Sequence, residues 1–151
     1  MNFSLVEEHP KIGVLNDEDL RFFYYDVGCD VLQDFPETYN WESVVSEFKG
    51  LIEFRTIAQE DYPDVCDDNS IYFTPKKYGK QDEELPAPAF FRHLRNAFSH
   101  YHIERRRGKY YLFDCDNNGT TTMLGKIDAE LLKKFCFRFF DQREIMLNGM
   151  R

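Results

Sequence analysis

The chain has 151 residues, a length that favours a single domain spanning 1–151, and 42% of them are hydrophobic, which excludes a disordered tail. No apolar run approaches the ~18 residues that a membrane span needs, and the first ten residues lack the basic and apolar parts of a secretory signal, so we expect a cytoplasmic protein. The net charge is −8, yet residues 1–91 carry 7 basic and 20 acidic side chains, whereas residues 92–151 carry 12 and 7. A basic C-terminal part suggests a local anionic partner; alternatively, the two sets of charges neutralise each other within one fold.

Two helices are predicted in the N-terminal part of the chain. Apolar residues recur at steps of three and four from Leu20 to Phe35, which predicts a helix that ends at Pro36. A second apolar pattern predicts a helix from Trp41 to about Ile57. Residues 63–88, with four prolines and many charges, predict a long loop, in which 71–73 form a short strand or pin the loop to the core.

The C-terminal part predicts two further helices and a hairpin. A helix is expected over 89–103, opened by Pro88. Strands over 111–115 and 120–127 flank a turn at 117–119, and Asp128 caps a last helix. The inward residues of that helix are Leu131, Leu132, Phe135, Phe139 and Met146. These elements predict an all-α fold, a four- to five-helix bundle with a small β-hairpin inserted before the last helix.

The four cysteines contain no CxxC pair, which disfavours a structural zinc site. In a protein without a secretory signal, buried free thiols are the expected state of Cys29, Cys66, Cys115 and Cys136.

The segment 90–107 holds the densest set of chemically active side chains. On a helical wheel its apolar arc contains Phe90, Phe91, Leu94, Ala97, Phe98 and Tyr101. The opposite, polar arc contains Arg92, His93, Arg95, Asn96, Ser99 and His100. A polar arc opposite an apolar one is also what any surface helix shows.

This polar arc suits the cleavage of RNA. Histidine takes a proton near neutral pH, and arginine holds phosphate oxygens as negative charge develops. Arg95 and His100 are five residues apart and therefore differ by ~140° around the helix. Because the two side chains do not lie on one line along the helix, we expect the site to need two copies of the chain.

Residues 95–100, Arg-Asn-Ala-Phe-Ser-His, resemble the RxxxxH motif of the HEPN superfamily, whose commonest form begins Arg-Asn. The resemblance covers 92–146, including the hairpin and the aspartate-opened helix. Over 1–62 it is limited to the architecture, because the family has two long helices there. It implies a helical bundle that dimerises through its motif helices. It also implies a metal-independent endoribonuclease, of a kind often found as a toxin or a defence and stress effector in bacteria.

By this resemblance, Arg95 is the phosphate-stabilising cation, His100 the general base or acid, and Asn96 the polar residue that supports the site. RNA-binding positions are then Arg92, Ser99, His102, Arg105, Arg106 and Arg107. The scheme needs no metal and no cofactor, and its partners are RNA, a second copy of the chain and a cognate antitoxin protein. The alternative is a non-catalytic HEPN module that binds RNA, a nucleotide or a protein partner.

Overall fold

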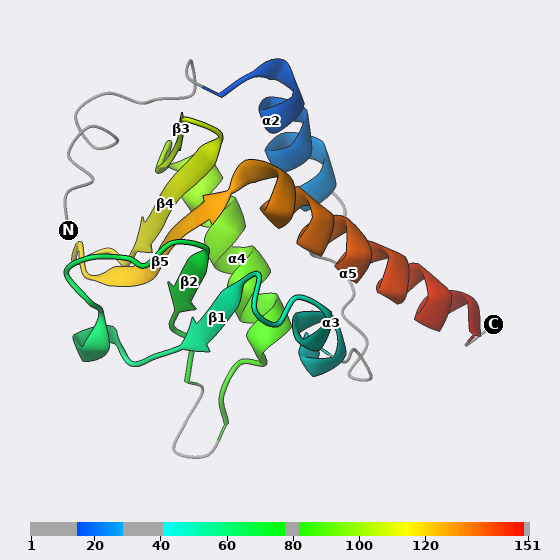
Figure 1. The fold of residues 1–151 in the computed structure, drawn as a ribbon. Helices are drawn as coiled ribbons and strands as arrows, with labels where there is room; N and C mark the ends of the chain where they lie inside the picture. Colours follow the sequence, from blue (N-terminus) through cyan, green and yellow to red (C-terminus); the bar gives the residue numbers. More distant parts are fainter. Residues whose placement is uncertain (1–14, 29–40, 78–81, 150–151) are drawn as a thin grey trace.

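The computed structural model describes residues 15–28, 41–77 and 82–149, with side chains up to residue 141. Four α-helices, two short helical segments and five strands are found in these ranges (Figure 1). In chain order they are α2 (Asp17–Arg21), η2 (Phe22–Val27), α3 (Trp41–Glu47), β1 (Glu53–Thr56), η3 (Gln59–Asp61), β2 (Ser70–Phe73), α4 (Pro86–Ser99), β3 (Ile103–Arg106), β4 (Lys109–Cys115), β5 (Thr121–Asp128) and α5 (Ala129–Gly149).

The five strands form one mixed sheet in the order β1-β2-β5-β4-β3. The edge strand β1 runs parallel to β2, and the other neighbours are antiparallel. Gly125 lies in the middle of β5, opposite Ile71 on one side and Leu112 on the other. A Cβ atom at Gly125 would lie 3.0 Å from the side chain of Leu112, so the glycine lets its apolar neighbours pack closely at the centre of the sheet.

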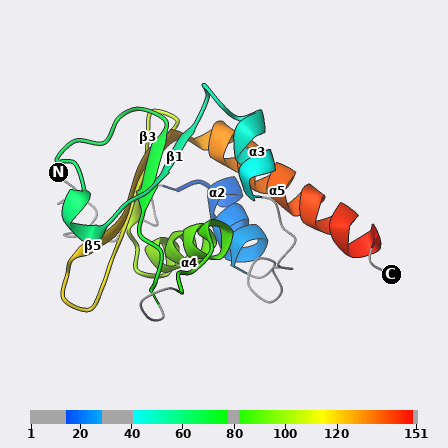
Figure 2. The ribbon, with the colours of Figure 1, turned by 90° about the horizontal axis from the view of Figure 1, so that it is seen from below.

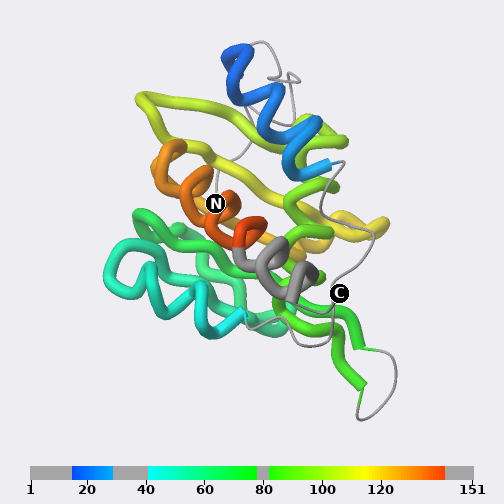
Figure 3. The backbone as a smooth tube through the Cα atoms, turned by 90° about the vertical axis from the view of Figure 1, so that its right-hand side faces the viewer, coloured from blue at the N-terminus to red at the C-terminus, as the bar shows by residue number. Residues whose placement is uncertain are grey.

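The helices α2, α3, α4 and α5 all lie on one face of the sheet (Figure 2). On that face α5 lies between the α2–η2 segment and α3 (Figure 3). The opposite face is partly covered by the segment that contains η3, through a small cluster formed by Cys66, Tyr72, Phe113 and Leu124. No helix in the described ranges is long and apolar enough to cross a membrane.

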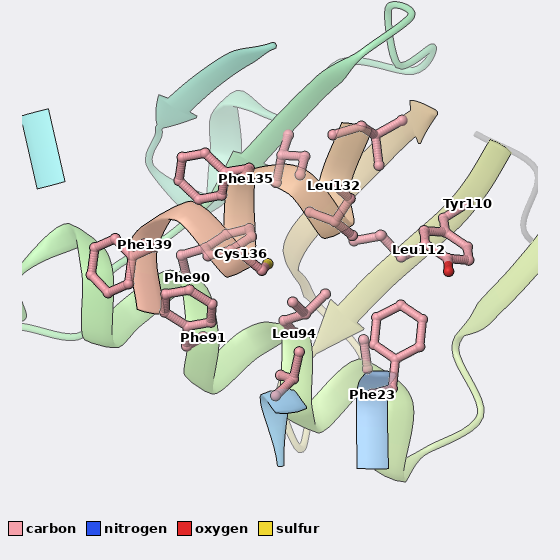
Figure 4. Close-up of a cluster of buried hydrophobic side chains, with 14 of the residues drawn as sticks. Phe23, Phe90, Phe91, Leu94, Tyr110, Leu112, Leu132, Phe135, Cys136 and Phe139 are labelled. Carbon is pink, nitrogen blue, oxygen red and sulfur yellow. The ribbon is translucent and has the colours of Figure 1, made fainter. Parts of the chain in front are cut away.

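Aromatic rings fill the space between the sheet, α4 and α5. Trp41 makes edge-on contacts with Phe54 and Phe135, with ring centroids 5.1 and 5.4 Å apart. Phe90, Phe91 and Phe139 pack at one end of this core, and Phe23, Tyr110 and Leu112 at the other (Figure 4). Edge-to-face contacts of this kind stabilise a core beyond the area that they bury.

The prediction of an all-α helical bundle is wrong, because the chain forms a mixed α/β fold. The helix predicted from Trp41 to Ile57 ends at Glu47, and Gly50 then adopts a positive φ of 84°. The residues beyond this turn form β1, whose backbone bonds to β2. Leu51, Ile52 and Ile57 continue the local helical pattern, and only pairing with a distant strand shows that residues 53–56 form a strand.

The second correction concerns the helix predicted over 89–103. It begins three residues earlier, at Pro86, and ends at Ser99, after which 103–106 form β3 on the edge of the sheet. The short strand at 71–73 and the β4–β5 hairpin are confirmed, as is the cap of the last helix, where Asp128 Oδ1 accepts a hydrogen bond of 2.9 Å from the Leu131 backbone. Cys66 and Cys136 are buried thiols without disulfides, and burial raises the pKa of Cys66 to about 12. Cys29, Pro36 and the side chain of Met146 lie outside the described residues.

A fully buried carboxylate, Asp19, ties α2 to the rest of the fold. It accepts hydrogen bonds from Tyr110 Oη on β4, from Arg105 Nη1 on β3 at 2.9 Å, and lies 3.0 Å from Lys133 Nζ on α5. Asp19 and Asn16 also form a capping box at the start of α2. Burial raises the pKa of Asp19, but the bonds from Tyr110, Lys133 and the Asn16 backbone outweigh it, so the pKa is lowered.

We expect Asp19→Ala to lower the free energy of unfolding by about 3 to 5 kcal/mol, because it leaves the buried Lys133 ammonium without its carboxylate. Urea denaturation measures the change. Asp17→Ala, at an exposed carboxylate on the same helix, is the control and should change stability by about 0.5 kcal/mol or less. Equal effects of the two substitutions would contradict the role of Asp19.

The same carboxylate predicts a dependence of stability on pH. Because folding lowers its pKa below the ordinary value of 3.8, its contribution is present above that value and is lost as the pH falls through the folded-state pKa. The stability difference between wild type and Asp19→Asn should therefore shrink as the pH is lowered from 6 towards about 2. A difference that stays constant over this range would contradict the prediction.

Candidate functional site

Helix α4 carries the predicted site residues. Prolines in its first turn suit positions whose backbone N–H has no helical partner. The helix buries an apolar stripe formed by Ala87, Ala89, Phe90, Phe91, Leu94 and Ala97. It ends in a Schellman motif, in which the His102 N–H donates to Ala97 O at 2.7 Å and the Tyr101 N–H to Phe98 O at 3.1 Å. Tyr101 therefore occupies the left-handed position, with a φ of 61°, where glycine is usual.

His93, which the wheel places on the polar arc, is only 2% exposed. Its Nδ1 atom lies 2.7 Å from Asp114 Oδ2 on β4, and its Nε2 atom lies 2.8 Å from the carbonyl oxygen of Thr74, just after β2. The side chain thus joins α4 to two strands of the sheet. The polar arc of the wheel is wrong at this position, because α4 lies over the sheet at an angle that buries one edge of that arc.

Both ring nitrogens of His93 face acceptors. The carbonyl of Thr74 has no proton, so Nε2 carries one and donates it. Nδ1 faces Asp114 Oδ2 at 2.7 Å, where the carboxylate accepts a hydrogen bond from a proton on the ring. Arg92 Nη2, 3.2 Å from Nε2, is then a neighbouring donor and not a partner.

The charge of Arg92 is taken up by a carboxylate. Its Nε and Nη2 atoms donate to Glu84 Oε2 and Oε1 at 3.0 and 2.7 Å. Burial raises the pKa of Glu84, but the bonds from Arg92 and from the Lys76 backbone outweigh it, so the pKa is lowered. This pair holds the 82–85 segment against α4 beside the His93–Asp114 pair.

A polar cavity of about 650 Å³ opens above the His93–Asp114 pair. Its polar lining includes Gln59, Lys76, Lys77, Arg92, Asn96, His100, Asn117 and Thr122, together with the carboxylates Glu60, Asp114 and Asp116. Asn96 and His100 are one helical turn apart and face this same cavity, and Asn96 Nδ2 lies 3.5 Å from Asp114 Oδ2. His100 is exposed, and its ring centroid lies 6.0 Å from that of His102, which stacks on Phe113 at 4.0 Å.

Arg95 and Ser99 face the other side of α4. They line a second, larger hollow of about 1250 Å³ between α4 and the α2–η2 segment. Arg95 and Ser99 are both exposed, and no carboxylate among the described residues lies within ion-pair distance of Arg95. We call the first hollow the His100 cavity and the second the Arg95 groove. Within one copy of the chain, the predicted catalytic pair is therefore divided between two depressions.

The three arginines at 105–107 differ in their surroundings. Arg105 bonds to Asp19, and Arg106 Nη2 lies 3.0 Å from Glu104 Oε2. Arg107 is exposed in the β3–β4 turn with a φ of 50°. Arg105 is thus neutralised by a carboxylate from the acidic N-terminal part of the chain, as one interpretation of the charge distribution expects, whereas Arg106 pairs with Glu104 from the basic C-terminal part.

Thr74, Glu84 and Thr122, which contact Arg92 or His93 beside the cavity, were not singled out from the sequence, and Asp114 was not predicted as the partner of His93. A signal for Asp114 was present, because a carboxylate between Phe113 and Cys115 in an apolar strand needs a buried partner. Nothing in the sequence pairs it with His93. In the described part of the chain, no three histidine, cysteine or acidic side chains gather as a metal site would require.

Comparison of the chain with protein-family models, with curated proteins and with solved structures gave no match. The family resemblance of residues 92–146 therefore stays a prediction.

We expect Asp114→Ala to lower the free energy of unfolding by about 1 to 3 kcal/mol, because it leaves a buried nitrogen of His93 without a partner. Asp114→Asn should cost less, since its amide N–H can donate to Nδ1 of the ring while Nε2 still donates to Thr74. Thermal denaturation of both variants measures the difference. The exposed Asp64→Ala is the control, and equal melting temperatures for all three would contradict the role of the pair.

Proposed function

We propose that the chain is a metal-independent endoribonuclease that uses His100 for proton transfer and Arg95 for stabilising the phosphate. The observation that carries this proposal is the position of His100. It is an exposed imidazole at the end of α4, on a polar cavity that also contains Asn96 and two lysines. An imidazole in contact with water exchanges protons near neutral pH, which RNA cleavage requires.

The proposed reaction begins when His100 removes the proton from a 2′-hydroxyl group. The oxygen attacks the adjacent phosphorus, and the bond from phosphorus to the 5′-oxygen breaks. The products are a 2′,3′-cyclic phosphate and a 5′-hydroxyl, which receives a proton from the imidazolium or from water. Arg95 stabilises the negative charge that develops on the phosphate oxygens, and Asn96 orients the imidazole or a phosphate oxygen.

The division of Arg95 and His100 between two depressions supports a site made by two copies of the chain. In a two-fold dimer, the His100 cavity of one copy faces the Arg95 groove of the other. Each dimer then holds two equivalent sites, and each site takes its histidine from one copy and its arginine from the partner.

The charges of the fold support one rival proposal, a non-catalytic module that binds RNA, a nucleotide or a protein. Arg92, Arg105 and Arg106 already have carboxylate partners, so less positive charge is left for an RNA backbone. The two proposals differ in whether RNA is cut.

We expect His100→Ala and Arg95→Ala each to lower the rate of RNA cleavage by at least ~100-fold. The first removes the group that transfers the proton, and the second removes the cation that stabilises the phosphate. Both residues are exposed, so both variants should keep the wild-type melting temperature. Cleavage of a labelled RNA pool in EDTA measures the rate. Arg55→Ala, an exposed arginine on β1, is the matched control and should cut as wild type does.

Mixing the two inactive variants tests the shared site. After subunit exchange, an equal mixture should regain about a quarter of the wild-type rate, since half of the dimers are mixed and each mixed dimer has one complete site. No recovery would place Arg95 and His100 in the same copy. No cleavage by the folded wild type would favour the non-catalytic module.

A further inference from the structure

The Arg95 groove has an unusual concentration of exposed tyrosines. Tyr24, Tyr25 and Tyr101 line it and are 61%, 58% and 44% exposed. They are three of the seven large apolar side chains that stand exposed among the described residues. The floor of the groove is also aromatic, because Phe23 and Phe98 stack there with ring centroids 5.5 Å apart.

The backbone that presents these tyrosines is irregular at two separate places. Tyr24 and Tyr25 lie in η2, a π-helix, a form that is rare and is often found at functional sites. Gly28 ends this wide turn, where a Cβ atom would lie 2.5 Å from the carbonyl oxygen of Tyr24. The turn is thus possible only with glycine at this position.

Tyr101 is held in a conformation that costs stability. It occupies the left-handed position of the Schellman motif that ends α4, where glycine has no steric penalty. Tyr101 is nevertheless 44% exposed. A strained, exposed tyrosine beside the proposed catalytic histidine is better explained by a ligand than by folding.

The charges of the groove indicate what that ligand is. Asp17 and Asp26 balance Arg21 and Arg95, so the groove has no excess of positive charge for a duplex backbone. Tyrosine faces beside Arg95, which has no carboxylate within ion-pair distance among the described residues, fit unpaired nucleobases, which stack on aromatic rings, together with one phosphate.

We infer that the Arg95 groove is a stacking platform for the bases of single-stranded RNA, with Tyr24, Tyr25 and Tyr101 as the stacking side chains. This inference rests on the proposed function and names its substrate class: unpaired RNA and not a duplex. The phosphate next to a stacked base lies at Arg95, and the platform thereby selects which bond is presented to His100.

The test uses the full chain and a fluorescent 12-nucleotide RNA whose 2′-hydroxyls are methylated, so that binding is measured without cleavage. Fluorescence anisotropy compares this strand with its own blunt duplex. Wild type should bind the single strand about tenfold more tightly than the duplex, with a weak dependence on salt. The combined Tyr24→Ala and Tyr25→Ala variant should weaken binding by roughly fivefold or more, whereas Tyr24→Phe with Tyr25→Phe should bind as wild type does.

Tyr101→Gly separates a binding role from a structural one. Glycine relieves the left-handed conformation, so the variant should melt at a higher temperature than wild type and yet bind the single strand more weakly. If Tyr101 were needed for folding, Tyr101→Gly would lower both the melting temperature and the affinity for the single strand. Leu85→Ala, which removes another exposed apolar side chain outside the groove, is the control and should leave binding unchanged.

Three results would overturn the inference. The wild type could bind the strand and the duplex equally well, the tyrosine variants could bind RNA as wild type does, or these variants could lose the dimer and still bind RNA unchanged. The last would assign the groove to a second copy of the chain. Cleavage of unmodified RNA is measured in parallel. Cleavage with tyrosine-independent binding would overturn the platform alone, whereas tyrosine-dependent binding without cleavage would overturn the proposed ribonuclease and leave a single-strand binding groove.

Discussion

The position of α4 depends on one buried polar contact, the pairing of His93 with Asp114 and with the carbonyl of Thr74. Apolar packing alone would let the helix rotate or slide, because its stripe of phenylalanine, leucine and alanine is adaptable. A hydrogen-bonded histidine with acceptors on both sides has few alternative positions, since any shift would leave a buried polar atom without a partner. The contact therefore determines where Asn96 and His100, further along the same helix, meet the cavity.

The Arg95 groove, on the other side of α4, depends on a second buried carboxylate. Asp19 binds side chains from β3, β4 and α5, and so it fixes the start of the α2–η2 segment against the sheet. The Arg95 groove lies between that segment and α4. One buried acidic residue thus positions each depression. The buried pairs give the two depressions a defined geometry, and breaking either pair is expected to cost stability because it leaves a buried polar or charged group without its partner.

The sequence predicted the local features of this fold and missed the long-range ones. The hairpin, the Asp128 cap, the strand at 71–73 and most of α4 follow from turn residues and from short periodic patterns. The sheet does not, because β1 and β3 become strands only by pairing with partners, and their own residues fit a helix as well. For the same reason the wheel placed Asn96, His100 and Arg95 correctly at the surface of α4 but gave no indication that His93 is buried on Asp114.

The distribution of paired and unpaired cations limits how any RNA is held. Glu84, Asp19 and Glu104 take up the charges of Arg92, Arg105 and Arg106, so these arginines offer little attraction to a phosphate chain. A protein with a net charge of −8 gains little from bulk electrostatic attraction to a phosphate chain. The proposed RNA substrate is therefore selected by short-range contacts at the end of α4, where an arginine, a histidine and exposed aromatic rings lie close together. Such contacts favour a short, unpaired stretch of RNA, because only unpaired bases can leave the stack and meet a side chain.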